Sequence, residues 1–297
     1  MSNLSGPADN NSFISFPRCF PVITTRPCLW ILASLWLSTT ALADERPNFV
    51  IFVADDMAWE DCGAYGHPNI RTPNIDALAA QGMRFDNAYL TCSSCSPSRC
   101  SIMTGRYPHS TGAAELHLPL PEDQTMMTAA LQKAGYWTAA VGKWHLGEAV
   151  ASQVDYRAAS PPSKMDDAWT TALKNRPQDR PFFLWAAHSD PHRGYQQGTI
   201  DPPHSRDDVI VPPFLPDTPE VRDDLALYYD EISRFDQHIG RVLAELDRQD
   251  VASSTFVLVI SDNGRPFPHC KTRVHVPGVR TPFVLRWPAR VAPGQVT

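Results

Sequence analysis

The stretch Asn48-Phe49-Val50-Ile51-Phe52-Val53-Ala54 is an apolar run that leads directly into two carboxylates, Asp55 and Asp56. Continuous apolar runs, unlike alternating ones, are typical of strands buried on both faces of a sheet. The same pattern recurs at 137–141 before Lys143 and His145, at 182–186 before Asp190 and His192, and at 256–260 before Asp262 and Asn263. The sequence therefore predicts buried strands with polar side chains gathered at their carboxyl ends.

Helical patterns lie between these runs. Thr72 and Pro73 are typical of a helix start, Gly82 of its end, and further helices are expected over 125–134 and 218–247. Alternating strands and helices predict an α/β fold, with a mainly parallel sheet flanked by helices on both faces and a site beyond the carboxyl ends of its strands.

Two polar or proline-rich stretches do not fit that alternation. Residues 148–179 and 193–217 are expected to form long loops over the face that carries the site.

The composition and net charge of the chain indicate which classes of binding partner to expect. The chain has 297 residues, of which 43% are hydrophobic and 20% charged, as in an ordinary globular protein. Its net charge is −6, so no basic field indicates nucleic acid or an anionic membrane surface, and no nucleic-acid partner is expected. An anionic substrate would need positive side chains concentrated in its site.

Residues 1–43 are predicted to be a signal peptide. Arg18 and Arg26 precede an apolar run at 28–37, and a cleavage site of small residues follows. The run is too short for a stable membrane span, although an uncleaved anchor is the alternative. The prediction is an exported protein, periplasmic or secreted, or lysosomal if the source is animal, with residues 44–297 as its catalytic domain.

An odd number of cysteines follows the predicted leader. They are Cys62, Cys92, Cys95, Cys100 and Cys270. In an oxidising compartment these cysteines would form disulfides in pairs, and at least one thiol would stay unpaired.

Asp55-Asp56 and Asp262-Asn263 form the first candidate constellation. Adjacent carboxylates repel each other unless a cation neutralises them, and oxygen donors suit a hard ion such as Ca²⁺ or Mg²⁺. A solvated turn is the alternative for either pair alone. Because both pairs end buried strands, the metal interpretation is favoured.

The stretch Cys95-Ser96-Pro97-Ser98-Arg99, followed by Thr104-Gly105, resembles the signature of the sulfatase family. That resemblance implies that Cys95 is oxidised to formylglycine by a formylglycine-generating enzyme before the chain folds. It also implies that one hydroxyl of the hydrated aldehyde attacks sulfur and the other allows release of the bound sulfate. A redox pair with Cys92, or a disulfide, is the alternative for Cys95, but neither explains Pro97 and Arg99.

The resemblance also implies roles for basic residues. Arg99 would hold the hydrate, Lys143 and Lys271 would bind sulfate oxygens, and His145 would contact the hydrate or shuttle its proton. The alternative for Lys143 and His145 is an ordinary half-buried strand end. His192 is the candidate general acid, because imidazole titrates near neutral pH, and a loop histidine is the alternative.

The implied metal site has Ca²⁺ as its ion, with Mg²⁺ as the alternative. Its ligands would be Asp55, Asp56, Cys95, Asp262 and Asn263.

Three stretches, 93–99, 179–193 and 261–268, are most similar to the heparan N-sulfatase group. This implies a sulfated carbohydrate substrate, with N-sulfoglucosamine as the candidate sugar, and His117 is either a sugar contact or a structural histidine. Lys271 differs from the arginine of that pattern, and lysine is not an equivalent anion grip. The family's smaller C-terminal domain has no counterpart before Thr297, so a truncated catalytic domain is expected.

Two other functions compete with a sulfatase. One is a phosphodiesterase or phosphonate hydrolase of the related alkaline phosphatase superfamily, which commonly uses two metals or a Thr or Ser nucleophile. The other is an inactive exported glycan-binding fragment.

Overall fold

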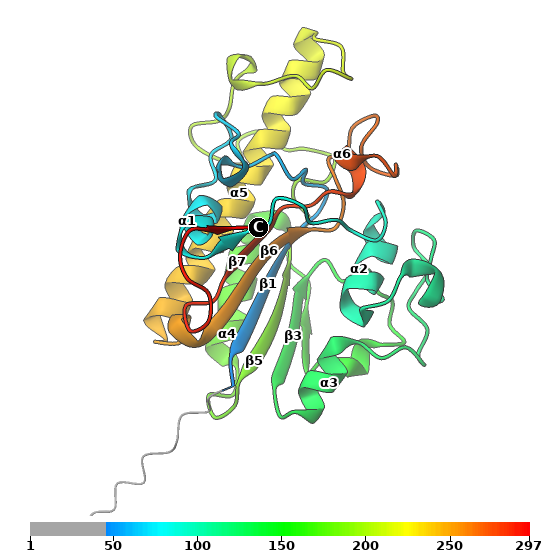
Figure 1. Ribbon diagram of the computed structural model, residues 1–297, viewed down its shortest axis with the longest axis vertical. Helices are drawn as coiled ribbons and strands as arrows, with labels where there is room; N and C mark the ends of the chain where they lie inside the picture. Colours follow the sequence, from blue (N-terminus) through cyan, green and yellow to red (C-terminus); the bar gives the residue numbers. More distant parts are fainter. Residues whose placement is uncertain (1–45) are drawn as a thin grey trace, which may run out of the picture. The chain divides into compact units, whose positions relative to one another are not determined.

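The computed structural model describes residues 46–297, so the signal peptide predicted over 1–43 lies outside the described residues. The described chain contains an eight-stranded sheet in the order β4-β3-β5-β1-β6-β7-β2-β8 (Figure 1). Its strands are β1 (Asn48–Ala54), β2 (Met83–Arg84), β3 (Trp137–Gly142), β4 (Tyr156–Ala158), β5 (Phe182–Ala187), β6 (Thr255–Ser261), β7 (Phe283–Arg286) and β8 (Gln295–Val296).

The central strands are parallel, as predicted. β1 pairs in parallel with β5 and β6, and β3 pairs in parallel with β4 and β5. β7 runs antiparallel to both β6 and β2. In the register of β1 with β6, Ala54 lies opposite Ser261, so the residues that follow these two strands leave the sheet side by side.

Helices cover both faces of the sheet, which confirms the predicted α/β architecture. The helices are α1 (Pro73–Gln81), α2 (Cys95–Thr104), α3 (Met127–Lys133), α4 (Met165–Asn175), α5 (Pro219–Arg248) and α6 (Val276–Val279). Figure 1 shows the helices on the two sides of the sheet. Val50 and Phe52 of β1 pack in the core with α1, α4 and α5, whereas Ile51 and Val53 pack in the core with α2. Burial on both faces explains why β1 is apolar without alternation.

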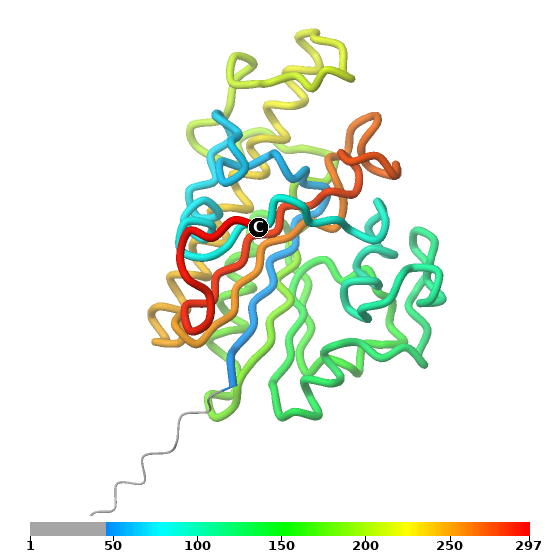
Figure 2. Tube along the Cα trace, in the orientation of Figure 1, coloured from blue at the N-terminus to red at the C-terminus, as the bar shows by residue number. Residues whose placement is uncertain are grey.

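The longest helix begins and ends close to its predicted bounds. Thr218 caps α5 by accepting a hydrogen bond from the Val221 backbone N at 3.4 Å, and Pro219 occupies the first turn. Every position of its predicted apolar face from Leu225 to Leu246 is buried. The Cα trace shows this helix crossing behind the sheet (Figure 2).

One predicted loop is wrong in large part. Residues 148–179 contain the edge strand β4 and helix α4, which packs Met165, Trp169 and Leu173 into the core. The spacing of these residues is helical, but charged neighbours dilute the pattern. By contrast, 193–217 forms a loop with a single short 3₁₀ turn at Arg206–Asp208.

All five described cysteines are free thiols, so no pairing among them occurs within residues 46–297. Cys62, Cys95, Cys100 and Cys270 are buried and Cys92 is partly exposed. In the same range, no helix is both long and apolar enough to cross a membrane.

Candidate functional site

The carboxyl ends of the parallel strands bring the predicted site residues together. Asp55 and Asp56 follow β1, Asp262 and Asn263 follow β6, and Lys143 follows β3. Backbone hydrogen bonds hold this edge: the Asp262 N donates to Ala54 O at 3.1 Å, and the Asp55 N donates to Asp190 O at 2.8 Å. These polar side chains therefore lie together at the carboxyl edge of the sheet.

Three carboxylates and one thiol form a buried group that we call the nucleophile cluster: Asp55, Asp56, Asp262 and Cys95. One ligand atom from each lies within 4.8 Å of the others. The Cys95 Sγ lies 3.6 Å from Asp55 Oδ1 and 3.7 Å from Asp56 Oδ1. Asp56 has a positive φ of 78°, a conformation that costs a non-glycine residue energy and is often found at functional sites.

Helix α2 supplies both Cys95 and Arg99. Cys95 is its first residue, and Arg99 lies one turn later on the same side, fully buried. The Arg99 Nε donates to Asp262 Oδ2 at 2.8 Å, and Nη1 donates to the Lys143 carbonyl at 2.9 Å. Its Nη2 has no hydrogen-bond partner among the described residues, and lies 3.9 Å from Asp55 Oδ1.

Each carboxylate of the cluster is matched by one cationic side chain. The Lys143 Nζ contacts Asp55 Oδ2, and the Lys271 Nζ donates to Asp56 Oδ2 at 2.7 Å. Arg99 takes the third carboxylate, that of Asp262. Lys143 and Lys271 were predicted as sulfate-binding groups, and the structure places both ammonium groups at the wall of the nucleophile cluster.

The electrostatics of the cluster disfavour a free thiolate. Burial first, and then the carboxylates of Asp262, Asp55 and Asp56, raise the pKa of the Cys95 thiol to about 12. Burial also raises the pKa of Asp262, against the opposing effect of Arg99. Because the thiolate is the reactive form of cysteine, an unmodified Cys95 is a weak nucleophile near neutral pH.

The cluster is chemically suited to a hard divalent cation. Three buried carboxylates lie together, and the Oδ1 atom of Asn263 is buried without a hydrogen-bond partner among the described residues. The Asn263 Nδ2 donates to Asp56 Oδ1 at 2.6 Å, which ties this amide to the cluster. Oxygen donors of this kind are those that Ca²⁺ and Mg²⁺ take in proteins.

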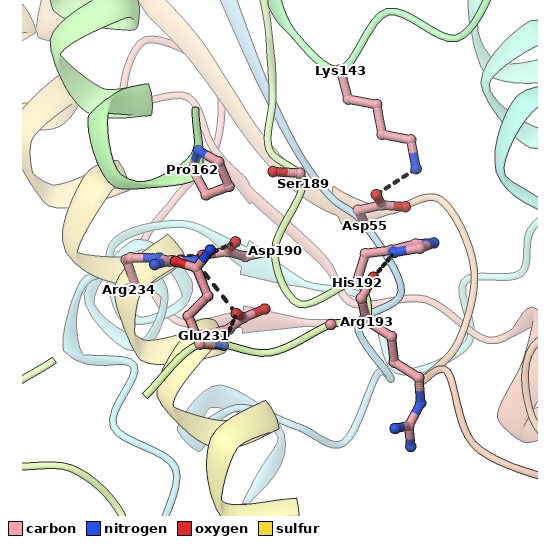
Figure 3. A pocket seen from close by; sticks show the side chains of 11 residues that line it. Asp55, Lys143, Pro162, Ser189, Asp190, His192, Arg193, Glu231 and Arg234 are labelled. Atoms are coloured by element: carbon pink, nitrogen blue, oxygen red, sulfur yellow. Dashed lines mark hydrogen bonds and ion pairs between the residues drawn. The ribbon is translucent and has the colours of Figure 1, made fainter. Parts of the chain in front are cut away.

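A cavity of about 290 Å³ adjoins the cluster (Figure 3). Asp55, Lys143 and His192 line it together with the start of the loop that follows β5. The His192 side chain is 41% exposed, and its Nε2 lies 3.8 Å from Asp56 Oδ2. The predicted general acid therefore borders both the cavity and the cluster.

His145 and His117 form a pair beside α2. The His117 Nδ1 and His145 Nε2 share a hydrogen bond at 2.8 Å, and the His117 backbone N donates to Ser96 Oγ at 2.8 Å. Burial, and then the charges of Lys143 and Arg99, lower the pKa of His145 to about 4. Within the described residues neither imidazole has a hydrogen bond to Cys95, and neither residue lines the cavity described above.

Two cavity residues, Glu231 and Arg234, were missed in the sequence, and Asp190 was expected at a strand end but was given no role. Asp190, Glu231 and Arg234 line the cavity, the last two from α5. Arg234 binds the Asp190 carboxylate in a bidentate ion pair at 2.6 and 2.7 Å. A signal was present, because Glu231 and Arg234 lie next to Ile232 and Phe235 on the apolar face of a helix, where charged residues are unusual.

Comparison with known proteins identifies the family of this chain. Residues 47–297 match the family model described as Sulfatase. The chain is 34% identical over 289 residues to human N-sulphoglucosamine sulphohydrolase, covering 85% of this chain and 57% of that protein. It is 30% identical over 315 residues to human N-acetylgalactosamine-6-sulfatase, covering 86% and 59%. The chain thus spans about three-fifths of the length of these curated relatives.

Solved structures share the fold at lower sequence identity. Ps i-CgsB, solved in complex with k-i-k-neocarrahexaose, has a TM-score of 0.70 at 23% identity, covering 84% of this chain and 68% of that one. The phosphonate monoester hydrolase of Agrobacterium radiobacter has a TM-score of 0.66 at 17% identity, covering 85% and 70%. At such identities the likeness concerns the fold alone. Since the family model matches nearly all of the described residues, this chain belongs to the sulfatase family.

Proposed function

We propose that this protein hydrolyses a sulfate ester or sulfamate on a sulfated glycan, with Cys95 as the precursor of a formylglycine nucleophile. The observation that carries the proposal is the position of Cys95. Its Sγ lies within 3.7 Å of two buried carboxylates, at the N-terminus of α2. Three cationic side chains surround the same cluster, which suits an anionic sulfate ester or sulfamate group.

The raised pKa of the Cys95 thiol supports a formylglycine nucleophile over an unmodified cysteine. A thiol whose pKa lies near 12 is largely protonated at neutral pH, so direct attack by sulfur is disfavoured. Formylglycine in its hydrated form supplies a hydroxyl nucleophile and a second hydroxyl that permits release of the sulfate. A plain serine or cysteine lacks that release step.

Asp55, Asp56, Asp262 and Asn263 would hold a divalent cation, for which Ca²⁺ is our first choice and Mg²⁺ the alternative. Their oxygen donors and the unpartnered Asn263 Oδ1 fit such an ion. The bound ion would act as a Lewis acid and lower the pKa of the hydroxyl nucleophile. Residue 95 itself would complete the ligand set.

The chain's own side chains have distinct tasks in this proposal. Arg99, fixed by Asp262 and by the Lys143 carbonyl, orients residue 95. Lys143 and Lys271 lie at the cluster wall, where a sulfate oxygen would meet them once a cation neutralises Asp55 and Asp56. His192, at the cavity edge, donates a proton to the departing oxygen or nitrogen.

The histidine pair has a supporting role. With its pKa near 4, His145 is neutral at physiological pH and can accept or donate through one ring nitrogen. Its Nδ1 is buried without a hydrogen-bond partner among the described residues, so it is free for a group added at residue 95. A sugar contact by His117, which is exposed, is part of the same proposal.

The substrate class follows from the relatives' names. One relative is named for N-sulphoglucosamine and another for N-acetylgalactosamine 6-sulfate, so a sulfated amino sugar is the proposed substrate. N-sulfoglucosamine is the first candidate because that relative has the higher identity of the two. We further propose that the chain is exported, with residues 1–43 as leader and 44–297 as catalytic domain.

The proposal is tested by trapping residue 95 with a hydrazine in protein purified from its native host, followed by peptide mass spectrometry. We expect an aldehyde adduct at residue 95. The same protein is then assayed on N-sulfoglucosamine, N-acetylgalactosamine 6-sulfate and an aryl phosphonate, with turnover expected on a sulfated sugar. An unmodified Cys95, in a host that matures other sulfatases, contradicts the mechanism, and preferred turnover of the phosphonate contradicts the reaction class.

A further inference from the structure

The cavity beside the nucleophile cluster has two chemically different ends. Asp55, Lys143 and His192 line the end that adjoins the cluster, whereas Glu231 and Arg234 line the other from α5. Figure 3 shows the α5 side chains across the cavity from Lys143. At about 290 Å³ the cavity is at the small end of the range for ligand sites, which suits one sugar ring and not a long oligosaccharide.

Glu231 is buried, with 2% of its surface exposed, yet only one of its carboxyl oxygens is used. Oε1 accepts a hydrogen bond from the Gln196 N at 3.1 Å and lies 3.6 Å from the Arg234 Nη2. No hydrogen bond or ion pair among the described residues reaches Oε2. Glu231 lines the cavity, so Oε2 is the carboxyl oxygen left to meet a ligand there.

The contact with Arg234 does not explain why the Glu231 carboxyl group is buried at this position. Arg234 directs Nε and Nη2 at Asp190, at 2.6 and 2.7 Å, and its contact with Glu231 is longer. Asp190 therefore already balances the guanidinium charge. Glu231 does not belong to the group of metal-ligating side chains found in the described chain, which consists of the nucleophile cluster.

The protonation of Glu231 is compatible with a neutral ligand. Burial, and then the nearby Asp190 carboxylate, raise the pKa of Glu231 to about 8. A carboxyl group that holds its proton near neutral pH can both donate to and accept from a hydroxyl group.

We infer that Glu231 is a specificity residue that hydrogen-bonds a hydroxyl group of the sugar whose sulfate lies at the nucleophile cluster. This inference rests on the proposed function. The sulfate group lies at the end of the cavity that adjoins the nucleophile cluster. The uncharged, hydroxyl-bearing side of the same ring reaches the end that α5 lines. The Gln196 backbone N and the Arg234 guanidinium hold Glu231 in place, so specificity comes from α5 whereas the chemistry comes from α2 and the strand ends.

The test compares two probes, inorganic sulfate and N-sulfoglucosamine, by calorimetric titration in the presence of Ca²⁺. All proteins carry Cys95→Ala in the full chain, which prevents turnover. The variants added to that background are Glu231→Ala, Glu231→Gln and, as a matched control, Asp247→Ala, an exposed acid on the same helix. Thermal melting of each variant reports whether the fold is kept.

We expect Glu231→Ala to weaken N-sulfoglucosamine binding about 10- to 100-fold, as for a lost hydrogen bond to an ionisable group, and to leave sulfate affinity unchanged. Glu231→Gln, which keeps a donor and an acceptor, retains most of the sugar affinity, and Asp247→Ala retains all of it. Equal losses for both probes, or no loss for either, overturn the inference. If the background protein binds neither probe, the anion site of the proposed function fails first; if it binds sulfate as tightly as the sugar, only the Glu231 inference fails.

Discussion

Two buried regions of this chain are rich in charge, and they differ in how that charge is arranged. In the nucleophile cluster, three carboxylates crowd within 4.8 Å of one another around Cys95. In the second region, which we call the α5 network, acidic side chains lie next to basic ones and not next to each other. Its members are Asp166, His188, Asp190, Arg234 and His238.

The members of the α5 network contact one another in a chain, and Asp166 at one end of it also pairs with Arg241. The Asp190 N donates to His188 Nδ1 at 2.8 Å, so the His188 proton is on Nε2, which donates to His238 Nδ1 at 3.0 Å. The His238 Nε2 then lies 3.4 Å from Asp166 Oδ1. This chain of contacts leaves no crowding of like charges. Buried charge alone therefore does not indicate a metal site, whereas crowded carboxylates next to an unpartnered amide oxygen do.

The largest expected effect comes from removing the proposed nucleophile. Cys95→Ala should lower sulfatase turnover about a thousandfold or more, because no other described side chain offers the covalent step. Its thermal midpoint should change little, since the carboxylates keep their cationic partners. Turnover is measured on N-sulfoglucosamine. Activity close to that of the unaltered protein would place the nucleophile elsewhere.

Removing the guanidinium of the α5 network should mainly affect stability. Arg234→Met leaves the buried Asp190 carboxylate without its bidentate partner, and we expect a loss of about 3–5 kcal/mol in the free energy of unfolding. Chemical denaturation measures this. The control Arg222→Met breaks the exposed pair with Asp217 and should leave the midpoint nearly unchanged. Equal effects of the two variants would show that burial of Asp190 is not what makes its pair important.

Cation removal should separate the two regions. Ca²⁺ at about 100 times its Kd should stabilise the folded protein by about 2.7 kcal/mol, and a chelator should abolish both this gain and turnover. In Asp56→Asn the gain should shrink, because one ligand of the nucleophile cluster loses its charge. Asp166→Asn, in the α5 network, should keep the full gain. If the calcium effect depended on Asp166 instead, the ion site would lie in the α5 network and the proposed cation site would be contradicted.

The smallest expected effect is a pH dependence of the α5 network. Burial, and then His188, lower the pKa of His238 to about 4, below its usual value near 6.5. A depressed histidine pKa means that the unfolded chain binds the proton more tightly, so stability is lost as pH falls from about 6.5 towards 4. The slope from this one group approaches about 1.4 kcal/mol per pH unit.

His238→Gln should flatten that slope, measured by denaturation at pH 7, 6 and 5. The comparison must be a difference between variants, because His67 and His145 also have pKa values lowered to about 4 and act in the same window. His109→Gln, at an exposed site, is the control and should leave the slope unchanged. An unaltered slope in His238→Gln would assign the acid sensitivity to the other two histidines.

Much of the fold could be predicted because its signals are local. The apolar runs of β1, β3, β5 and β6 and the three-and-four spacing of α5 need no tertiary information. The helix α4 was missed because Asp166 and Asp167 interrupt its apolar positions, and its burial depends on α5 and the sheet. The short strands are defined by their pairing and not by a sequence pattern: β4 pairs with β3, β2 with β7, and β8 with β2.

By itself the sequence determined that carboxylates would gather at one edge of the sheet, because parallel strands that begin together also end together, and Asp55 and Asp262 each follow such a strand. That Cys95 joins them was expected only from the resemblance to sulfatases. Only the tertiary structure decided which cation pairs with which carboxylate, and that Glu231 and Arg234 enter the cavity wall. The physical reason is distance along the chain. Arg99 and Asp262 are 163 residues apart, and the contact between their side chains depends on how helices dock on the sheet, which no local pattern encodes.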